Sequence, residues 1–384
     1  MKKLLNILLV SLLISSSITT VNAQDEILFR KHIISSGWNG LFYGIALDVI
    51  GEVDGAAAAG IPVIAAGSSA LLPLLTNPSK QINYNSLVLG GHGRSIGWAH
   101  GFALATLIGG ERAWWGNDTS SNNYKLSVAA GALTSIGMGI LGHSLGKNQD
   151  WSEGQVSLFR HYGWVMPFTG FSLMASLSEE PRLFGGAVLL FGAGGYLLAN
   201  GVNNWNEFTR GEVRATQVLS ALHLGLGYGI FADRVERGLS SDEDFADINW
   251  MIPAAGTLAG TLIGHFWTKN TQLTPQQGLF TAYAAGGGAI VGLGIALLVE
   301  SDEITPYYLI PYATGTAAYA FMLERLRRTN RTQGYLPAGK NNNWEFAFMP
   351  HNLFINNKIN QRGYFLNGRY MGGMQPLFSA SLKF

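Results

Sequence analysis

Long apolar stretches alternate with short polar segments along most of this chain. Inside the apolar stretches, polar and apolar residues do not alternate with the two-residue period of a half-buried strand. The stretch "AAGTLAGTLIGHFW", which ends at Trp267, is an example. Such stretches predict helices rather than the strands of a transmembrane barrel. We therefore predict an all-α fold of paired helices.

The polar segments divide the predicted helices into about five pairs. The first helices of the pairs are expected at about 27–50, 86–108, 153–177, 210–235 and 276–299. The second helices are expected at 55–75, 125–146, 182–202, 248–267 and 306–327. Asparagines recur between the pairs roughly every 60 residues, a length that suits a two-helix repeat. These are Asn77, Asn148, Asn204, Asn270 and Asn330.

Three of the first helices carry the same start signal. A hydroxyl residue is followed three positions later by Gln or Glu, the pattern of a capping box, in which both side chains bind free backbone N–H groups. An apolar residue precedes each hydroxyl, and Pro275 follows the last one, where a proline loses no helical hydrogen bond. The pairs are Ser152 with Gln155, Thr209 with Glu212 and Thr274 with Gln277.

Small residues recur at every fourth position inside the predicted helices, which places them on one helix face. A glycine inside a helix costs about 1 kcal/mol relative to alanine. This cost is offset where the missing side chain lets two helices pack closely. We therefore predict close helix contacts at Gly93, Gly97, Gly101; Gly131, Ser135, Gly139; Gly256, Gly260, Gly264; and Gly288, Gly292, Ala296.

The N-terminal residues have the layout of a secretory signal peptide: two lysines, an apolar run too short to span a bilayer, and a small residue at Ala23. The predicted domains are a signal peptide at 1–23, a helical-repeat domain at 24–330 and a strand-rich tail at 331–384. The chain has no Cys, which excludes disulfides, thiolate metal sites and a Cys-linked lipid anchor.

Charge and hydropathy narrow the class of partner. The formal net charge of +1 provides no broad basic face for nucleic acid. Only 13% of residues are charged, and the mean hydropathy is +0.17. Several stretches, including 279–299, could cross a bilayer. Acidic residues gather in the loops within pairs, and basic residues between pairs. For an exported N-terminus this distribution is the reverse of the positive-inside rule of inner-membrane proteins.

The tail contains short strand-like segments separated by Asn and Gly. In the last segment Phe378, Ala380, Leu382 and Phe384 share one face. A terminal Phe that closes such a strand resembles the assembly signal of outer-membrane β-barrel proteins, although the tail is too short to form a barrel alone. Two alternatives remain: a hairpin packed on the last helix, or a strand added to a partner's sheet.

The stretch "GHSLG" at 142–146 matches the G-x-S-x-G turn that presents the nucleophilic serine of α/β-hydrolases. That turn requires a preceding strand, whereas Ser144 follows a predicted helix. We therefore interpret Ser144 as a helix-end residue. His143 and His265 occupy equivalent repeat positions, which favours a structural role for both. Metal-binding spacings of histidine are missing, and we expect neither a metal nor another cofactor.

Two further groups are candidate contact sites. Arg160 and His161 are adjacent near the start of a predicted helix and could contact a phosphate or a partner's carboxylate. Trp114 and Trp115 lie in the longest loop, where exposed aromatic rings would suit a membrane interface or a protein contact. With Phe378, Leu382 and Phe384, the two tryptophans form the predicted partner or membrane surface.

Three hypotheses for function remain. The first is an exported, non-catalytic structural or accessory subunit of an outer-membrane complex, such as a scaffold or a periplasmic-side plug of a secretion pore. The second is a membrane-spanning channel or transporter, and the third a hydrolase of envelope lipid. For the first, we expect an outer-membrane protein partner and membrane contact. The sequence identifies no small-molecule substrate.

Overall fold

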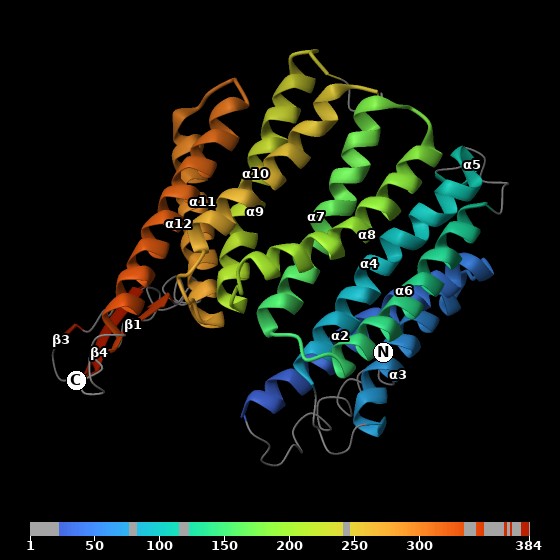
Figure 1. Ribbon diagram of the computed structural model, residues 1–384, viewed down its shortest axis with the longest axis horizontal. Helices are drawn as coiled ribbons and strands as arrows, with labels where there is room; N and C mark the ends of the chain where they lie inside the picture. Colours follow the sequence, from blue (N-terminus) through green and yellow to red (C-terminus); the bar gives the residue numbers. More distant parts are fainter. Residues whose placement is uncertain are drawn as a thin grey trace. The chain divides into compact units, whose positions relative to one another are not determined.

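The protein is described by a computed structural model (Figure 1). It describes residues 23–76, 83–114, 123–240, 246–333, 343–348, 365–366, 369–370 and 378–383. The chain divides into two compact units, Met1–Asn330 and Arg331–Phe384. Apart from Ala23, the predicted signal peptide lies outside the described residues.

The first unit is all-α, as predicted. Within its described residues, the long helices form five consecutive hairpins that lie side by side in chain order (Figure 1). The hairpins are α2 (Ala23–Gly51) with α3 (Gly55–Thr76), α4 (Tyr84–Gly109) with α6 (Asn123–Asn148), α7 (Glu153–Leu177) with α8 (Pro181–Trp205), α9 (Arg210–Glu236) with α10 (Met251–Thr268), and α11 (Pro275–Val299) with α12 (Thr305–Gln333). Short helices α5 (Glu111–Trp114) and η1 (Ile248–Trp250) precede α6 and α10.

Polar caps fix where the first helices of the later hairpins begin. Thr209 and Glu212 form the complete capping box at the start of α9, and Thr274 and Gln277 form it at the start of α11. At α7, the Ser152 hydroxyl accepts the backbone N–H of Gln155. The Gln155 side chain lies near Asn200 of α8, with 3.4 Å between its Nε2 and Asn200 Oδ1. The box predicted there is therefore present only in its first half.

The small-residue faces bring helix backbones together inside the hairpins, as predicted. A Cβ added to Gly97 of α4 would lie 2.5 Å from the Cα of Ser135 in α6, and one added to Gly101 would lie 2.5 Å from the Cα of Gly131. Because rising positions in α4 meet falling positions in α6, the two helices are antiparallel. In α9–α10, a Cβ at Gly260 would lie 2.6 Å from the carbonyl oxygen of Leu219.

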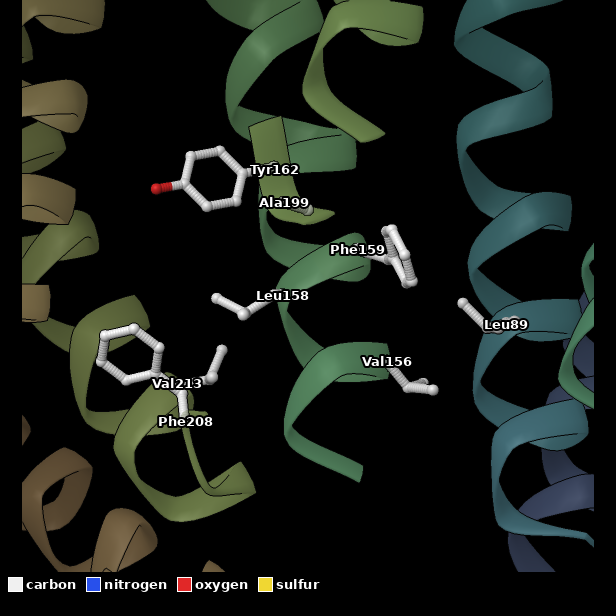
Figure 2. Close-up of a cluster of buried hydrophobic side chains, with 8 residues drawn as sticks. All are labelled: Leu89, Val156, Leu158, Phe159, Tyr162, Ala199, Phe208 and Val213. Atoms are coloured by element: carbon white, nitrogen blue, oxygen red, sulfur yellow. The ribbon is translucent and has the colours of Figure 1, made fainter. Parts of the chain in front are cut away.

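Neighbouring hairpins share a hydrophobic core centred on α7. Figure 2 shows Val156 and Phe159 of α7 directed toward Leu89 of α4, while Leu158 is directed toward Val213 of α9. Phe208, just before α9, belongs to the same buried cluster. Because α7 contributes side chains to both sides, it joins the second hairpin to the fourth.

The second unit, taken by itself, has short strands. Strand β1 (Asn343–Phe348) pairs antiparallel with β4 (Phe378–Lys383), so that Trp344 is opposite Leu382. Strand β2 (Phe365–Leu366) pairs antiparallel with β3 (Arg369–Tyr370).

Candidate functional site

Arginines from two adjacent helices gather near the helix starts. Arg160 lies on α7, in the second turn, and Arg210 and Arg214 lie one turn apart on α9. The charges of both Arg160 and Arg210 act on Arg214. We call these three residues the arginine cluster. Tyr84, the first residue of α4, completes the group, because the guanidinium of Arg210 lies 4.4 Å from the centre of its ring.

The cluster carries more positive charge than its ion-pair partner neutralises. Arg210 donates to the carboxylate of Glu153 at 3.2 Å. Arg214 donates to the backbone carbonyl of Pro275 at 3.1 Å, which neutralises no charge. Arg160 is exposed, and among the described residues its guanidinium has no hydrogen-bond or ion-pair partner. Among the described residues, the three positive guanidinium groups are therefore paired with a single negative carboxylate, that of Glu153.

The structure does not bring Arg160 and His161 together at one surface. His161 is buried, and its Nε2 hydrogen-bonds with the hydroxyl of Thr261 in α10 at 3.0 Å. Adjacent residues of a helix point about 100° apart, so one reaches the surface while the other meets α10. Because the side chain of His161 forms a hydrogen bond inside the protein, only Arg160 of the predicted pair is exposed for contact with an anion.

Histidines and tyrosines make the polar contacts between hairpins. His265 of α10 hydrogen-bonds with Tyr162 of α7 at 3.0 Å, and His92 of α4 with Tyr196 of α8 at 3.1 Å. The third contact joins His223 of α9 to Tyr312 of α12 at 3.1 Å. The same chemistry therefore recurs at three boundaries between hairpins.

Two histidines are held by their own helix. The Nδ1 of His223 lies 2.9 Å from the carbonyl oxygen of Leu219, and that of His100 lies 2.9 Å from the carbonyl oxygen of Ile96. A carbonyl can only accept, so the Nδ1 of each ring carries the proton and Nε2 is an acceptor. Tyr312 therefore donates its hydroxyl proton to His223.

The predicted equivalence of His143 and His265 is not seen in their surroundings. His265 is buried against α7, whereas His143 is exposed on α6. The ring of His265 is paired with Tyr162 of α7, whereas the ring of His143 is exposed although α6 also packs against the preceding hairpin through α2. Position in the sequence repeat therefore does not determine burial.

Ser144 lies inside α6, which continues to Asn148. Its hydroxyl is exposed, and the Nδ2 of Asn148 approaches it at 3.4 Å. The strand-to-helix turn of a hydrolase is missing at this position. Across the described part of the chain, no three His, Asp or Glu side chains are grouped as metal ligands.

The predicted partner surface is described only in part. Trp114 is the last residue of α5, while Trp115 lies outside the described residues. Phe378 and Leu382 lie in β4, and Phe384 lies outside the described residues.

Charged residues sort to the two ends of the hairpins. The turns within hairpins carry Glu52, Glu180 and Glu303, and Figure 1 shows the turns of α7–α8, α9–α10 and α11–α12 at its upper edge. Lys147 and Lys269 lie at the opposite helix ends, between hairpins. At the acidic end, a hydrogen bond to Asp233 raises the pKa of Arg237.

Large apolar side chains cover much of the outer surface. Five described helices are long and apolar enough to cross a membrane: Leu28–Gly51, Gly55–Leu75, Tyr124–Asn148, Pro181–Trp205 and Pro275–Val299. Leucines of α8 and α11 point outward, with Leu190 75% exposed and Leu298 84% exposed. By contrast, α7 and α9, which carry the arginine cluster, expose few large apolar residues.

No protein-family model, no curated protein and no solved structure matches this chain significantly.

Sequence reasoning named Arg160 as a candidate contact residue but did not name the two arginines beside it as candidates. Arg210 and Arg214 are four residues apart, so the sequence already places them on one face of α9. The sequence could not show that this face lies beside α7. That neighbourhood is set by the order in which the hairpins pack.

Proposed function

We propose that this protein is an exported, membrane-embedded, non-catalytic structural subunit of an outer-membrane complex. The observation that carries the proposal is the outward direction of apolar side chains on helices long enough to span a bilayer. On α11 these residues include Ile290, Val291, Leu297 and Leu298, each between 59% and 84% exposed. Water-soluble monomers rarely expose apolar patches of this extent. Lipid or a partner protein must cover this surface.

Helix dimensions support lipid as the cover. Helices α8 and α11, two of the five candidate spans, have 25 residues each. At 1.5 Å per residue each is about 37 Å long, enough for the hydrocarbon core of about 30 Å. Glycine-mediated backbone contacts and interhelical hydrogen bonds are the means by which helices associate in lipid, where apolar burial provides little driving force.

Export and the outer-membrane location are supported by sequence features. These features are the expected signal peptide, the reversed charge distribution and the terminal Phe strand. We propose that the tail residues Phe378, Leu382 and Phe384 and the loop residues Trp114 and Trp115 contact a partner protein. The helical unit would then scaffold a pore or plug it from the periplasmic side.

We also propose that the five hairpins descend from one two-helix repeat. The side chains of Ser152, Thr209 and Thr274 each accept the backbone N–H of the residue three positions later, at the starts of α7, α9 and α11. Asn330, near the end of α12, donates to the carbonyl of Thr271 at 2.9 Å. Repeats of this kind bury a continuous core by stacking on their neighbours.

Cysteine labelling tests membrane embedding directly, because the chain has no native Cys. Leu190 is 75% exposed in the middle of α8, and the side chain of Glu303 is 72% exposed in a turn. In sheared membranes, a membrane-impermeant maleimide should label Glu303→Cys and leave Leu190→Cys unreacted until the protein is denatured. Equal labelling of the two variants would exclude burial of α8 in lipid.

The location is tested by separating the inner and outer membranes of the native cell on a density gradient. We expect the protein in the outer-membrane fraction, resistant to extraction at alkaline pH, together with a partner that cross-links to the tail. Loss of that cross-link in Leu382→Ala and Phe384→Ala variants would assign the contact to the last strand. Recovery with the inner membrane would contradict the proposed location.

A membrane channel or transporter is the second candidate. It is favoured by a chain of buried polar groups, in which His161, Thr261 and Ser220 are joined by hydrogen bonds of 3.0 Å across α7, α10 and α9. Polar residues within a membrane often mark a transport path. Ion or solute flux through reconstituted vesicles that His161→Ala abolishes would favour this candidate. If the reconstituted protein does not change the permeability of the vesicles, the transporter candidate is rejected and the structural role is favoured.

A further inference from the structure

We propose that the arginine cluster binds the phosphate group of an anionic phospholipid. The inference rests on the proposed membrane embedding and adds a ligand to it. Arg210 of α9 is ion-paired at 3.2 Å with Glu153 of α7, and Arg160 lies two turns beyond Glu153 on the same face of α7, where its charge acts on Arg214. Guanidinium groups present planar forks of donors that match phosphate oxygens. An anion that meets Arg160 would supply the negative charge that this group lacks.

With the helix starts at the outer edge of the headgroups, Arg214 lies within the headgroup layer and Arg160 lies just beneath it. Arg160 is the eighth residue of α7, and Arg214 the fifth residue of α9. At 1.5 Å per residue, their Cα atoms lie about 10 Å and about 6 Å along the helices from their starts. Polar headgroups occupy roughly the outer 5–8 Å on each side of the hydrocarbon core. The long arginine side chains can extend from this depth to the phosphate layer.

The surface beyond Arg160 favours a lipid over a free anion. Trp164 and Phe168 follow Arg160 at intervals of four on α7 and so share its face. Trp164 is 46% exposed, and Phe168 packs against Tyr228 of α9 with 6.3 Å between ring centres. An apolar strip thus runs from the cluster toward the middle of the helix. Such a strip can carry an acyl chain while the arginines hold its headgroup.

The test uses the full-length protein in a neutral detergent and follows its thermal unfolding midpoint. The ligands are phosphatidylglycerol, phosphatidylcholine, inorganic phosphate and poly-glutamate. We expect phosphatidylglycerol to raise the midpoint of the wild type. In Arg160→Gln, half-saturation should need about tenfold more of this lipid, because a charge-assisted hydrogen bond contributes about this factor to affinity. Arg160→Lys should give an intermediate value, since it keeps the charge and loses the fork.

Arg328→Gln is the matched control. Arg328 is 77% exposed near the end of α12 and is ion-paired with Glu324, so its substitution removes the same charge from a different helix. We expect this variant to respond to phosphatidylglycerol like the wild type. An equal loss in Arg328→Gln and Arg160→Gln would overturn a specific site.

The other ligands separate the possible occupants. Phosphatidylcholine should have a weaker effect, and inorganic phosphate or poly-glutamate at equal charge should have none. A full response to inorganic phosphate would overturn the lipid assignment in favour of a free anion, and a full response to poly-glutamate would favour an acidic protein segment. If phosphatidylglycerol does not raise the unfolding midpoint while Leu190→Cys is still protected from labelling, only the lipid site is rejected. Free labelling of Leu190→Cys would reject membrane embedding itself.

Discussion

The α4–α6 hairpin and the α7–α10 boundary hold helices together in different ways. Inside the hairpin, Gly97 and Gly101 let the two backbones touch, and the Ser135 hydroxyl donates to the carbonyl of Arg94 at 2.7 Å. At the boundary, large side chains from both helices are joined by hydrogen bonds, His161 with Thr261 and Tyr162 with His265. The hairpin contact depends on the lack of side chains at glycine positions. The boundary contact depends on pairs of side chains that can form hydrogen bonds.

The difference matters because each contact fails differently. A backbone contact is intolerant of added volume, since main-chain atoms cannot move aside without bending a helix. A side-chain hydrogen bond tolerates small shifts but loses energy when one partner is removed. Substitutions that add volume should therefore damage the hairpins most, and substitutions that remove polar atoms should damage the boundaries.

The largest effect is expected for Gly97→Leu. Its Cβ would lie 2.5 Å from the Cα of Ser135, so α4 and α6 must separate. Overpacking typically costs about 1–3 kcal/mol and occasionally more, and we expect the upper end of that range because the added side chain meets main-chain atoms. The free energy of unfolding in mixed detergent measures it. Gly91→Leu, in the same helix, is the control, because a Cβ added at Gly91 would have no neighbouring atom within 4 Å. Similar losses in both variants would show that the cost is not a helix contact.

A smaller loss is expected for Tyr162→Phe. It removes the hydroxyl that bonds to Nε2 of His265, whose Nδ1 is buried without a partner among the described residues. Leaving a buried polar group unpaired costs about 1–3 kcal/mol, and in membranes such bonds average nearer 0.6 kcal/mol. Tyr228→Phe, at a ring that is 49% exposed, should cost little. If Tyr162→Phe costs as much in a His265→Leu background, the hydrogen bond is not the cause.

The last prediction concerns the difference between two helix caps and refines the comparison between hairpins. Thr209 completes its capping box and also donates to the carbonyl of Leu273 at 2.7 Å, whereas Ser152 has only half a box. We expect Thr209→Ala to destabilise the protein by about 1–2 kcal/mol and Ser152→Ala by about 0.5–1 kcal/mol. Denaturant unfolding of both variants measures the difference. A larger loss for Ser152→Ala would contradict this ranking.

Much of the helical architecture could be predicted from local sequence. Hydroxyl caps, fourfold glycine spacing and long apolar stretches act within one or two helical turns, so they define a helix before its neighbours are known. The helix limits at α7, α9 and α11 follow from Ser152, Thr209 and Thr274 for this reason. The helical interpretation of "GHSLG" rested on the same local signals, and Ser144 lies within α6.

The candidate site depended on contacts that no local pattern contains. Arg160 was visible in the sequence, but its neighbours Arg210 and Arg214 belong to the next hairpin. The sequence suggests that His161 is a surface residue beside Arg160. In the structure its Nε2 lies 3.0 Å from the hydroxyl of Thr261 in α10. His143 and His265 were equivalent along the chain and differ in burial.

The sequence by itself determined that this chain forms capped, glycine-faced helices, because propensity, capping and spacing operate over a few residues. Only the tertiary structure decided which faces are buried, which histidines find a tyrosine, and where three arginines meet. These outcomes depend on residues far apart in the chain: Tyr162 and His265 are 103 positions apart, and Arg160 and Arg214 are 54 positions apart. Their proximity follows from the order in which hairpins stack, and that order is a property of the packed molecule.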